Sequence, residues 1–126
     1  MIRIDLKSDT PIYTQLRNQI ILAIAKGEVQ PGDPMPTVRQ LAEDLGVNPM
    51  TVNKAYGELK QLGHLETNIR QGATVRSEFV QRGDYWNETK PQLELLIAES
   101  ILNGITQAQF ESVVHELYRK FQEVSR

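Results

Sequence analysis

Few side chains in this sequence have the type and spacing that catalysis or metal binding requires. The only histidines, His64 and His115, lie far apart and fit no metal-ligand pattern such as His-Glu-x-x-His. The adjacent acids Glu43 and Asp44 would point in different directions from a helix, so they cannot form a paired acid-base site by themselves. Cysteine is absent, which excludes thiol chemistry and cysteine-bound zinc, and there is no phosphate-binding glycine loop or nucleophile elbow. We therefore expect no enzyme activity, no metal site and no cofactor.

The size and composition indicate a small folded protein. The chain has 126 residues, of which 40% are hydrophobic and 24% charged, as in one domain or one small domain with an appendage. No apolar run approaches the ~18 residues of a membrane helix, and the N-terminus lacks the pattern of a signal peptide. The lack of cysteine fits a reducing compartment. We expect a cytoplasmic protein without membrane association.

The charge is unevenly distributed along the chain. The net charge at pH 7 is -2, whereas nucleic-acid binders are usually basic. Residues 1–76 carry nine Lys and Arg against eight Asp and Glu, and residues 77–126 carry five against eight. A nucleic-acid surface would therefore lie in the first part and depend on basic groups that cluster in space.

The first part of the chain predicts a short strand followed by three helices. Residues 2–4 alternate apolar and polar as in a half-buried strand, and residues 11–26 have a helical apolar period bounded by proline and glycine. A turn-rich connector, 27–36, leads to Thr37, which is a good N-cap for a second helix ending at Gly46. Its expected inward residues are Val38, Leu41, Ala42 and Leu45.

The third helix follows at once. Asn48 can cap it and Pro49 suits its first position. Its expected inward residues are Val52, Ala55, Tyr56, Leu59 and Leu62. Two short helices joined by a glycine-containing turn are typical of a helix-turn-helix, although an ordinary helical hairpin has the same pattern.

A β-hairpin after the third helix decides between these two interpretations. Residues 65–67 and 73–75 are strand-like runs around a tip that contains glycine. With residues 2–4 as a further strand, the order is strand, three helices and hairpin. The predicted fold is thus mainly α with a small β-wing: a winged helix-turn-helix DNA-binding domain at 1–76.

Residues 77–126 form the second predicted segment, a helical pair. Residues 77–90 are a linker or the start of a helix, and Pro91 is expected near that helix's first turn. Gly104 ends this helix, and Thr106 with Gln109 has the spacing of a capping box for the last helix. The apolar face comprises Leu93, Leu96, Ile97, Ile101, Phe110, Val113, Val114, Leu117, Tyr118 and Phe121.

Two helices of this size cannot cover so much apolar surface between them, and about 50 residues seldom form an independent core. The pair must therefore pack on its own winged helix or on a second copy of the chain. We favour a homodimer, because two-fold dimers are the commonest oligomers and readers of this kind bind paired half-sites.

Several motifs with fixed spacing resemble the DNA-binding domain of GntR-type regulators. They are Pro11-Ile12-Tyr13-x-Gln15-Leu16, the run from Gly27 to Ala42, Gly46-Val47-Asn48-Pro49-x-Thr51-Val52, and Ala55-Tyr56-x-Glu58-Leu59. The two-helix tail resembles the YtrA-like subfamily. This resemblance implies a dimeric repressor of an operon, often one encoding an ABC transporter, that binds a palindromic double-stranded DNA operator in the major groove.

The resemblance also implies which residues contact DNA. They are Arg39, Asn48, Thr51, Asn53 and Lys54 in the helices and Arg70, Gln71 and Gly72 in the wing. Some relatives have arginine and a polar residue where this chain has Pro49 and Met50, and many have two basic residues around the wing glycine. With so few cations we expect a modest salt dependence of binding.

Two questions stay open at this point. A winged helix sometimes binds protein instead of DNA, and the acidic net charge would suit that function. A small-molecule effector is the second question: Tyr85 and Trp86 would either line a shallow site at the dimer interface or pack the linker against a helix.

Overall fold

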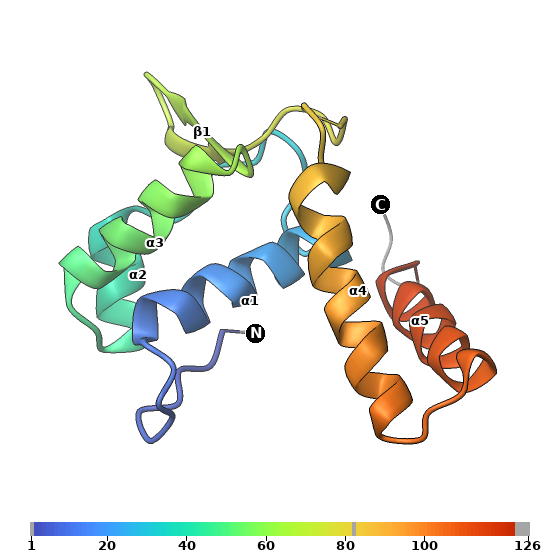
Figure 1. Ribbon diagram of the computed structural model, residues 1–126. Coiled ribbons are helices and arrows are strands. Elements are labelled where there is room, and N and C mark those ends of the chain that lie inside the picture. Colours follow the sequence, from blue (N-terminus) through green and yellow to red (C-terminus); the bar gives the residue numbers. More distant parts are fainter. Residues whose placement is uncertain (1, 82, 123–126) are drawn as a thin grey trace. The chain divides into compact units, whose positions relative to one another are not determined.

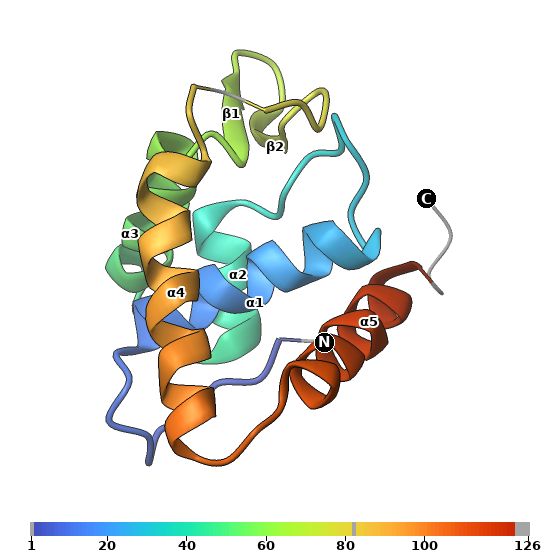
Figure 2. The same cartoon turned by 45° about the vertical axis from the view of Figure 1, so that its right-hand side comes forward.

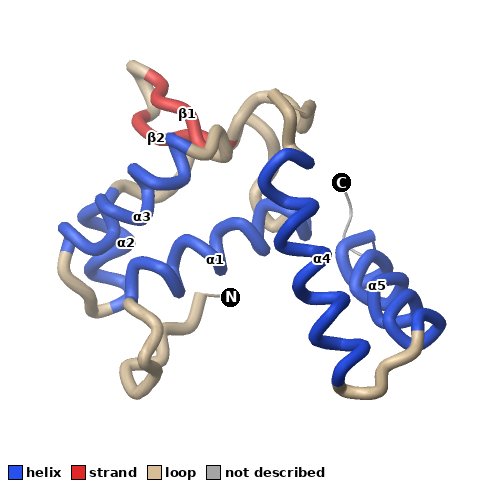
Figure 3. Tube along the Cα trace, viewed as in Figure 1, coloured by secondary structure: helices blue, strands red, loops and turns tan. Residues whose placement is uncertain are grey.

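A computed structural model describes residues 2–81 and 83–122, and the chain divides into two compact units between Phe79 and Val80. The first unit contains α1 (Ile12–Lys26), α2 (Val38–Leu45), α3 (Pro49–Gln61), β1 (Leu65–Asn68) and β2 (Gly72–Val75) (Figure 1). The second contains α4 (Trp86–Leu102) and α5 (Gln107–Gln122). The predicted class, mainly α with a small β-wing, is confirmed (Figure 3).

The core of the first unit is built from one face of each of its elements. α1 packs on α3, α3 packs on α2, and the hairpin closes the end of α3. The largest fully buried side chains are Leu16, Ile20, Val52, Leu59, Leu65 and Val75. Leu62, which we expected to point inward, is 55% exposed, because α3 ends at Gln61 and Leu62 forms its C-cap.

The predicted strand at residues 2–4 does not form. Two glutamine side chains of α1 bind this backbone instead: the Arg3 N–H donates to Gln19 Oε1 (2.6 Å), and the Asp5 N–H donates to Gln15 Oε1 (2.8 Å). The Gln19 and Gln15 amides donate in return to the Arg3 and Asp5 carbonyls. The apolar alternation correctly indicated which residues face inward, since Ile2 and Ile4 pack against the core. The hydrogen bonds that a neighbouring strand would have made are made by the two glutamine side chains.

The connector between α1 and α2 pairs with the free edge of the hairpin. β1 and β2 pair antiparallel with Leu65 opposite Val75 and Asn68 opposite Gly72. On the other edge of β2, the Met35 N–H donates to the Ala73 carbonyl (2.8 Å) and the Val75 N–H donates to the Asp33 carbonyl (2.9 Å). The connector thereby fixes the wing beside the start of α2 (Figure 2).

The second unit is a pair of helices joined at Asn103–Thr106. Contrary to expectation, Pro91 lies inside α4, which begins at Trp86. Proline has no N–H to donate to the Asn87 carbonyl one turn earlier, and α4 therefore lacks that hydrogen bond. The predicted capping box of α5 is confirmed: the Gln109 N–H donates to Thr106 Oγ1 (3.2 Å) and the Thr106 N–H donates to Gln109 Oε1 (2.8 Å).

Candidate nucleic-acid interface

The turn between α2 and α3 is fixed by hydrogen bonds at both helix starts. At α2, the Gln40 N–H donates to Thr37 Oγ1 and the Thr37 N–H donates to Gln40 Oε1, each at 3.1 Å, which makes a complete capping box. At α3, the Met50 N–H donates to Asn48 Oδ1 (2.8 Å). Gly46 ends α2 with a φ of 68°, a conformation that favours glycine. Both predicted caps are confirmed, so α3 starts at a defined position.

α3 has two opposite faces with different roles. Val52, Ala55, Tyr56 and Leu59 are buried in the core. Met50, Asn53, Lys54 and Gly57, spaced at i, i+3, i+4 and i+7, are exposed. We call these four residues the exposed stripe of α3. Thr51, a predicted DNA contact, lies off this stripe and is half-buried.

The backbone amides at the start of α3 already have partners. Pro49 has no N–H, the Met50 N–H is bound by the Asn48 side chain, and the Thr51 N–H donates to the Asn48 carbonyl (2.9 Å). A helix start binds phosphate through free amides. In this geometry, side chains rather than these amides are the groups available to a phosphate.

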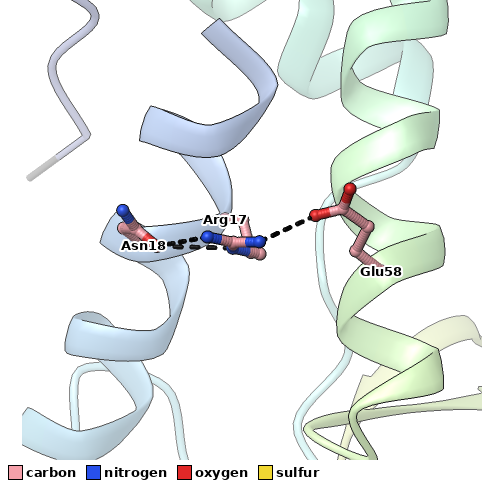
Figure 4. Close-up of polar contacts among 3 residues, drawn as sticks. All are labelled: Arg17, Asn18 and Glu58. Carbon is pink, nitrogen blue, oxygen red and sulfur yellow. Dashed lines mark hydrogen bonds and ion pairs between the residues drawn. The ribbon is translucent and has the colours of Figure 1, made fainter. Parts of the chain in front are cut away.

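Two contacts of matching spacing join α1 to α3. The Lys54 ammonium lies over the Tyr13 ring, 3.8 Å from its centroid. One turn further along both helices, Arg17 Nη1 lies 3.1 Å from Glu58 Oε2, and Arg17 also donates to Asn18 (Figure 4). We call these contacts the two rungs. They hold Lys54 in place and neutralise the carboxylate that α3 carries on the flank of its exposed stripe.

A buried tyrosine ties α3 to the segment before α2. The Tyr56 hydroxyl donates to the Pro36 carbonyl (2.7 Å), and burial raises the pKa of Tyr56 to about 12. Pro36 directly precedes the Thr37 cap. The same residue therefore packs in the core and connects the two helices of the helix-turn-helix.

The wing tip is shaped by Asn68. Its side-chain oxygen accepts from the Arg70 N–H (2.9 Å) and from the Gln71 N–H (3.1 Å), while Gly72 has a φ of 76°. Ile69, Arg70 and Gln71 are all exposed. The wing thus presents an arginine and an amide from a tip with a defined backbone.

Seven of the eight predicted DNA-contact residues are exposed, and Thr51 is the exception. All eight lie in the first unit: Arg39 is near the start of α2, four lie in or next to the first turns of α3, and three are in the wing. Two further residues contribute to this surface and were not predicted from the sequence: Tyr13, whose ring contacts Lys54, and Asn68, which shapes the tip. An asparagine four residues before a turn glycine is a signal that would have found Asn68.

The apolar residues of the second unit remain uncovered within one chain. Among the described residues of α4 and α5, none is buried. The predicted dimer residues Leu93, Leu96, Ile97, Ile101, Val113, Val114, Leu117 and Tyr118 keep 38% to 65% of their surface exposed, and Phe110 and Phe121 are half-buried. The described residues contain no helix long and apolar enough to cross a membrane. Over the same residues, no group of three or more His, Cys, Asp and Glu is placed to hold a metal ion.

Comparison with known proteins agrees with this geometry. Residues 12–75 match the model of the bacterial regulatory proteins of the gntR family. The chain is 37% identical over 120 residues to the HTH-type transcriptional repressor YtrA of Bacillus subtilis (strain 168), covering 93% of this chain and 92% of that protein. These proteins are transcription regulators and not enzymes, which confirms the expectation that the chain has no enzyme activity.

Two solved structures extend the comparison. A transcriptional antiterminator from Listeria monocytogenes EGD-e, 28% identical, superposes with a TM-score of 0.84 over 96% of this chain and 92% of that one. AraR(DBD) in complex with operator ORX1, 26% identical, has a TM-score of 0.53 and covers 59% of this chain and 95% of that chain. The first likeness extends over both units, and the second is to a domain bound to DNA.

Proposed function

Because the chain belongs to the GntR family of bacterial DNA-binding transcription regulators, and within it resembles YtrA, we propose that it is a dimeric repressor that binds a palindromic operator. The exposed stripe of α3 would enter the major groove of each half-site. The wing would contact the adjoining backbone or minor groove. The eight predicted contact residues are the groups that would carry this binding.

The observation that carries this proposal is the two-faced structure of α3. One face supplies the core, and the opposite face presents three exposed side chains: an amide, a cation and an apolar group. A helix is the element that fits the major groove, and amide groups there form paired hydrogen bonds with adenine edges. Asn53 is the side chain on the stripe able to do this.

The second unit supports the dimer. Eight of the predicted dimer residues of α4 and α5 stay exposed in one chain, and a second copy would cover the same patch on both partners. A two-fold dimer presents two copies of α3, which requires half-sites about 34 Å apart or a multiple of that spacing. The operator would therefore be a symmetric sequence.

The regulated genes follow from resemblance alone. YtrA is named a transcriptional repressor, and the likeness extends over almost the whole chain. We place this protein in the cytoplasm, with an operon that includes an ABC transporter as its target. Control by a small-molecule effector would act through the helical pair, because a change there alters the spacing of the two α3 helices.

The test is selection of bound duplexes from a random DNA library by the purified full chain, followed by measurement of the mass of the free protein. We expect an inverted repeat and a dimer. Leu117→Asp places a charge on the apolar patch and should yield monomers with weakened binding, whereas Ser112→Asp, on the same helix, should remain a dimer. A wild-type protein that enriches no sequence, or a Leu117→Asp variant that stays dimeric, would refute the corresponding part of the proposal.

A further inference from the structure

Met50 is an exposed apolar residue on the face of α3 that the proposed function assigns to DNA. It is the second residue of the helix, and 78% of its surface is exposed. Its neighbours on the stripe are Asn53 and Lys54, both polar. An isolated exposed apolar residue is common on protein surfaces and needs no explanation by itself. The position of Met50 on the stripe and its fixed backbone set it apart.

The backbone of Met50 is held in place at the edge of the helix. Its N–H donates to Asn48 Oδ1 (2.8 Å), and the residue before it is Pro49, whose ring fixes its own φ. Because the Met50 N–H already has a partner, the side chain is the part of the residue that we expect to meet a ligand. A thioether side chain is flexible and polarizable and adapts to an apolar surface.

The major groove offers such a side chain one apolar partner. Thymine is the one base that presents a methyl group there, on its C5 atom. On the basis of the proposed function, we infer that Met50 determines specificity by packing against the C5-methyl of one thymine in each half-site. Asn53 and Lys54, one turn further along the stripe, supply the polar contacts around it.

Deoxyuridine tests this inference directly, because it differs from thymidine only by that methyl group. In a duplex selected by the wild-type protein, each thymine is replaced in turn by deoxyuridine, and binding is measured by fluorescence anisotropy. We expect one thymine per half-site at which the replacement weakens binding about fourfold, the effect of one buried methyl group. Replacements elsewhere should have little effect.

Variants of Met50 assign the effect to this side chain. Met50→Gln keeps the length but removes the apolar end, and it should bind the thymine and uracil duplexes equally. Met50→Leu should restore the preference for thymine. Leu62→Gln, which changes an apolar residue 55% exposed beyond the end of α3, serves as the control and should discriminate as the wild type does.

The outcomes separate this inference from the proposed function. If the protein binds a selected duplex but ignores every methyl group, or if Met50→Gln keeps the discrimination, the role of Met50 is refuted while DNA binding stands. If no duplex is selected at all, the proposed function fails and this inference fails with it.

Discussion

The ion pair of Arg17 and Glu58 links the stability of the first unit to the charge of α3, the helix that we propose enters the DNA groove. Replacing Arg17 with methionine keeps much of the side chain's length but removes the guanidinium that lies 3.1 Å from Glu58. The Glu58 carboxylate then remains on α3 without its cation. We expect Arg17→Met to lower both the free energy of unfolding and the affinity for DNA.

The exposure of the two side chains sets the expected size of the effect on stability. They are 31% and 30% exposed, between a surface pair and a buried one. Surface pairs contribute about 0.2–1 kcal/mol, and breaking a fully buried pair costs about 3–5 kcal/mol. We therefore expect Arg17→Met to lower the free energy of unfolding by about 1–2 kcal/mol. Arg17→Met combined with Glu58→Gln should lose less, because no unpaired charge remains.

Urea denaturation followed by circular dichroism measures the first effect, with both single variants and the double variant completing the cycle. Fluorescence anisotropy on a selected duplex measures the second: Arg17→Met should bind less tightly at low salt, because the unpaired carboxylate repels phosphate, and the double variant should recover. Raising the salt should narrow the difference in affinity between them.

Two results would contradict this reasoning. If the losses of stability in the two single variants simply add up in the double variant, the two side chains do not interact in solution. If Arg17→Met binds DNA as tightly as the double variant, the Glu58 carboxylate does not affect the interface.

Three further changes test other features of the first unit. Burial raises the pKa of Tyr56 from 10.0 to about 12, so the unfolded chain loses the Tyr56 proton at a lower pH than the folded chain does, and the free energy of unfolding should fall between pH 10 and 12. Tyr56→Phe should remove this part of the fall, and it should also remove the last step of a titration that follows phenol absorbance. Gly57→Ala should raise the free energy of unfolding by about 0.5–1 kcal/mol in thermal melts, since the added Cβ meets nothing within 4 Å and glycine is a poor helix former. Arg39→Ala should weaken operator binding by roughly 1–3 kcal/mol in the anisotropy assay and leave the dimer's mass unchanged; unaltered affinity would remove Arg39 from the interface.

The parts of this fold that could be predicted are those set by neighbouring residues. Thr37 and Asn48 cap the helices they were expected to cap, because a capping side chain reaches only two or three residues along the chain. The hairpin of β1 and β2 follows from its glycine-containing tip in the same way. The positions of α3 and the wing could therefore be predicted from local sequence, without any tertiary contact.

The errors arose where a distant partner decides the outcome. Residues 2–4 have a strand's alternation, but whether they form a strand depends on which groups bind their backbone, and Gln15 and Gln19 do so. The connector at 33–35 was expected to be only a turn, yet it pairs with β2. Neither outcome is encoded in a local pattern.

The two rungs were also beyond prediction, for a related reason. Tyr13 and Arg17 are one turn apart, and so are Lys54 and Glu58, but only the packing of α1 against α3 brings them into register. Sequence alone marked Lys54 as a cation on an exposed helix face and gave no partner for it. The structure shows its ammonium over an aromatic ring of α1, 3.8 Å from the ring centroid.

The small number of cations among the predicted DNA contacts would connect the proposed dimer and the proposed apolar contact in one mechanism. Of the predicted contacts only Arg39, Lys54 and Arg70 are cations, so one copy has little electrostatic attraction for a duplex. Nonspecific binding depends almost wholly on that attraction. A protein with few cations therefore dissociates easily from DNA of any sequence that it does not recognise. In the proposed function, affinity would then come from two copies acting together and from contacts that depend on the base sequence. In the proposed function, Met50 and Asn53 of the stripe supply contacts of that kind, so selectivity would come from them rather than from the few cations of α3.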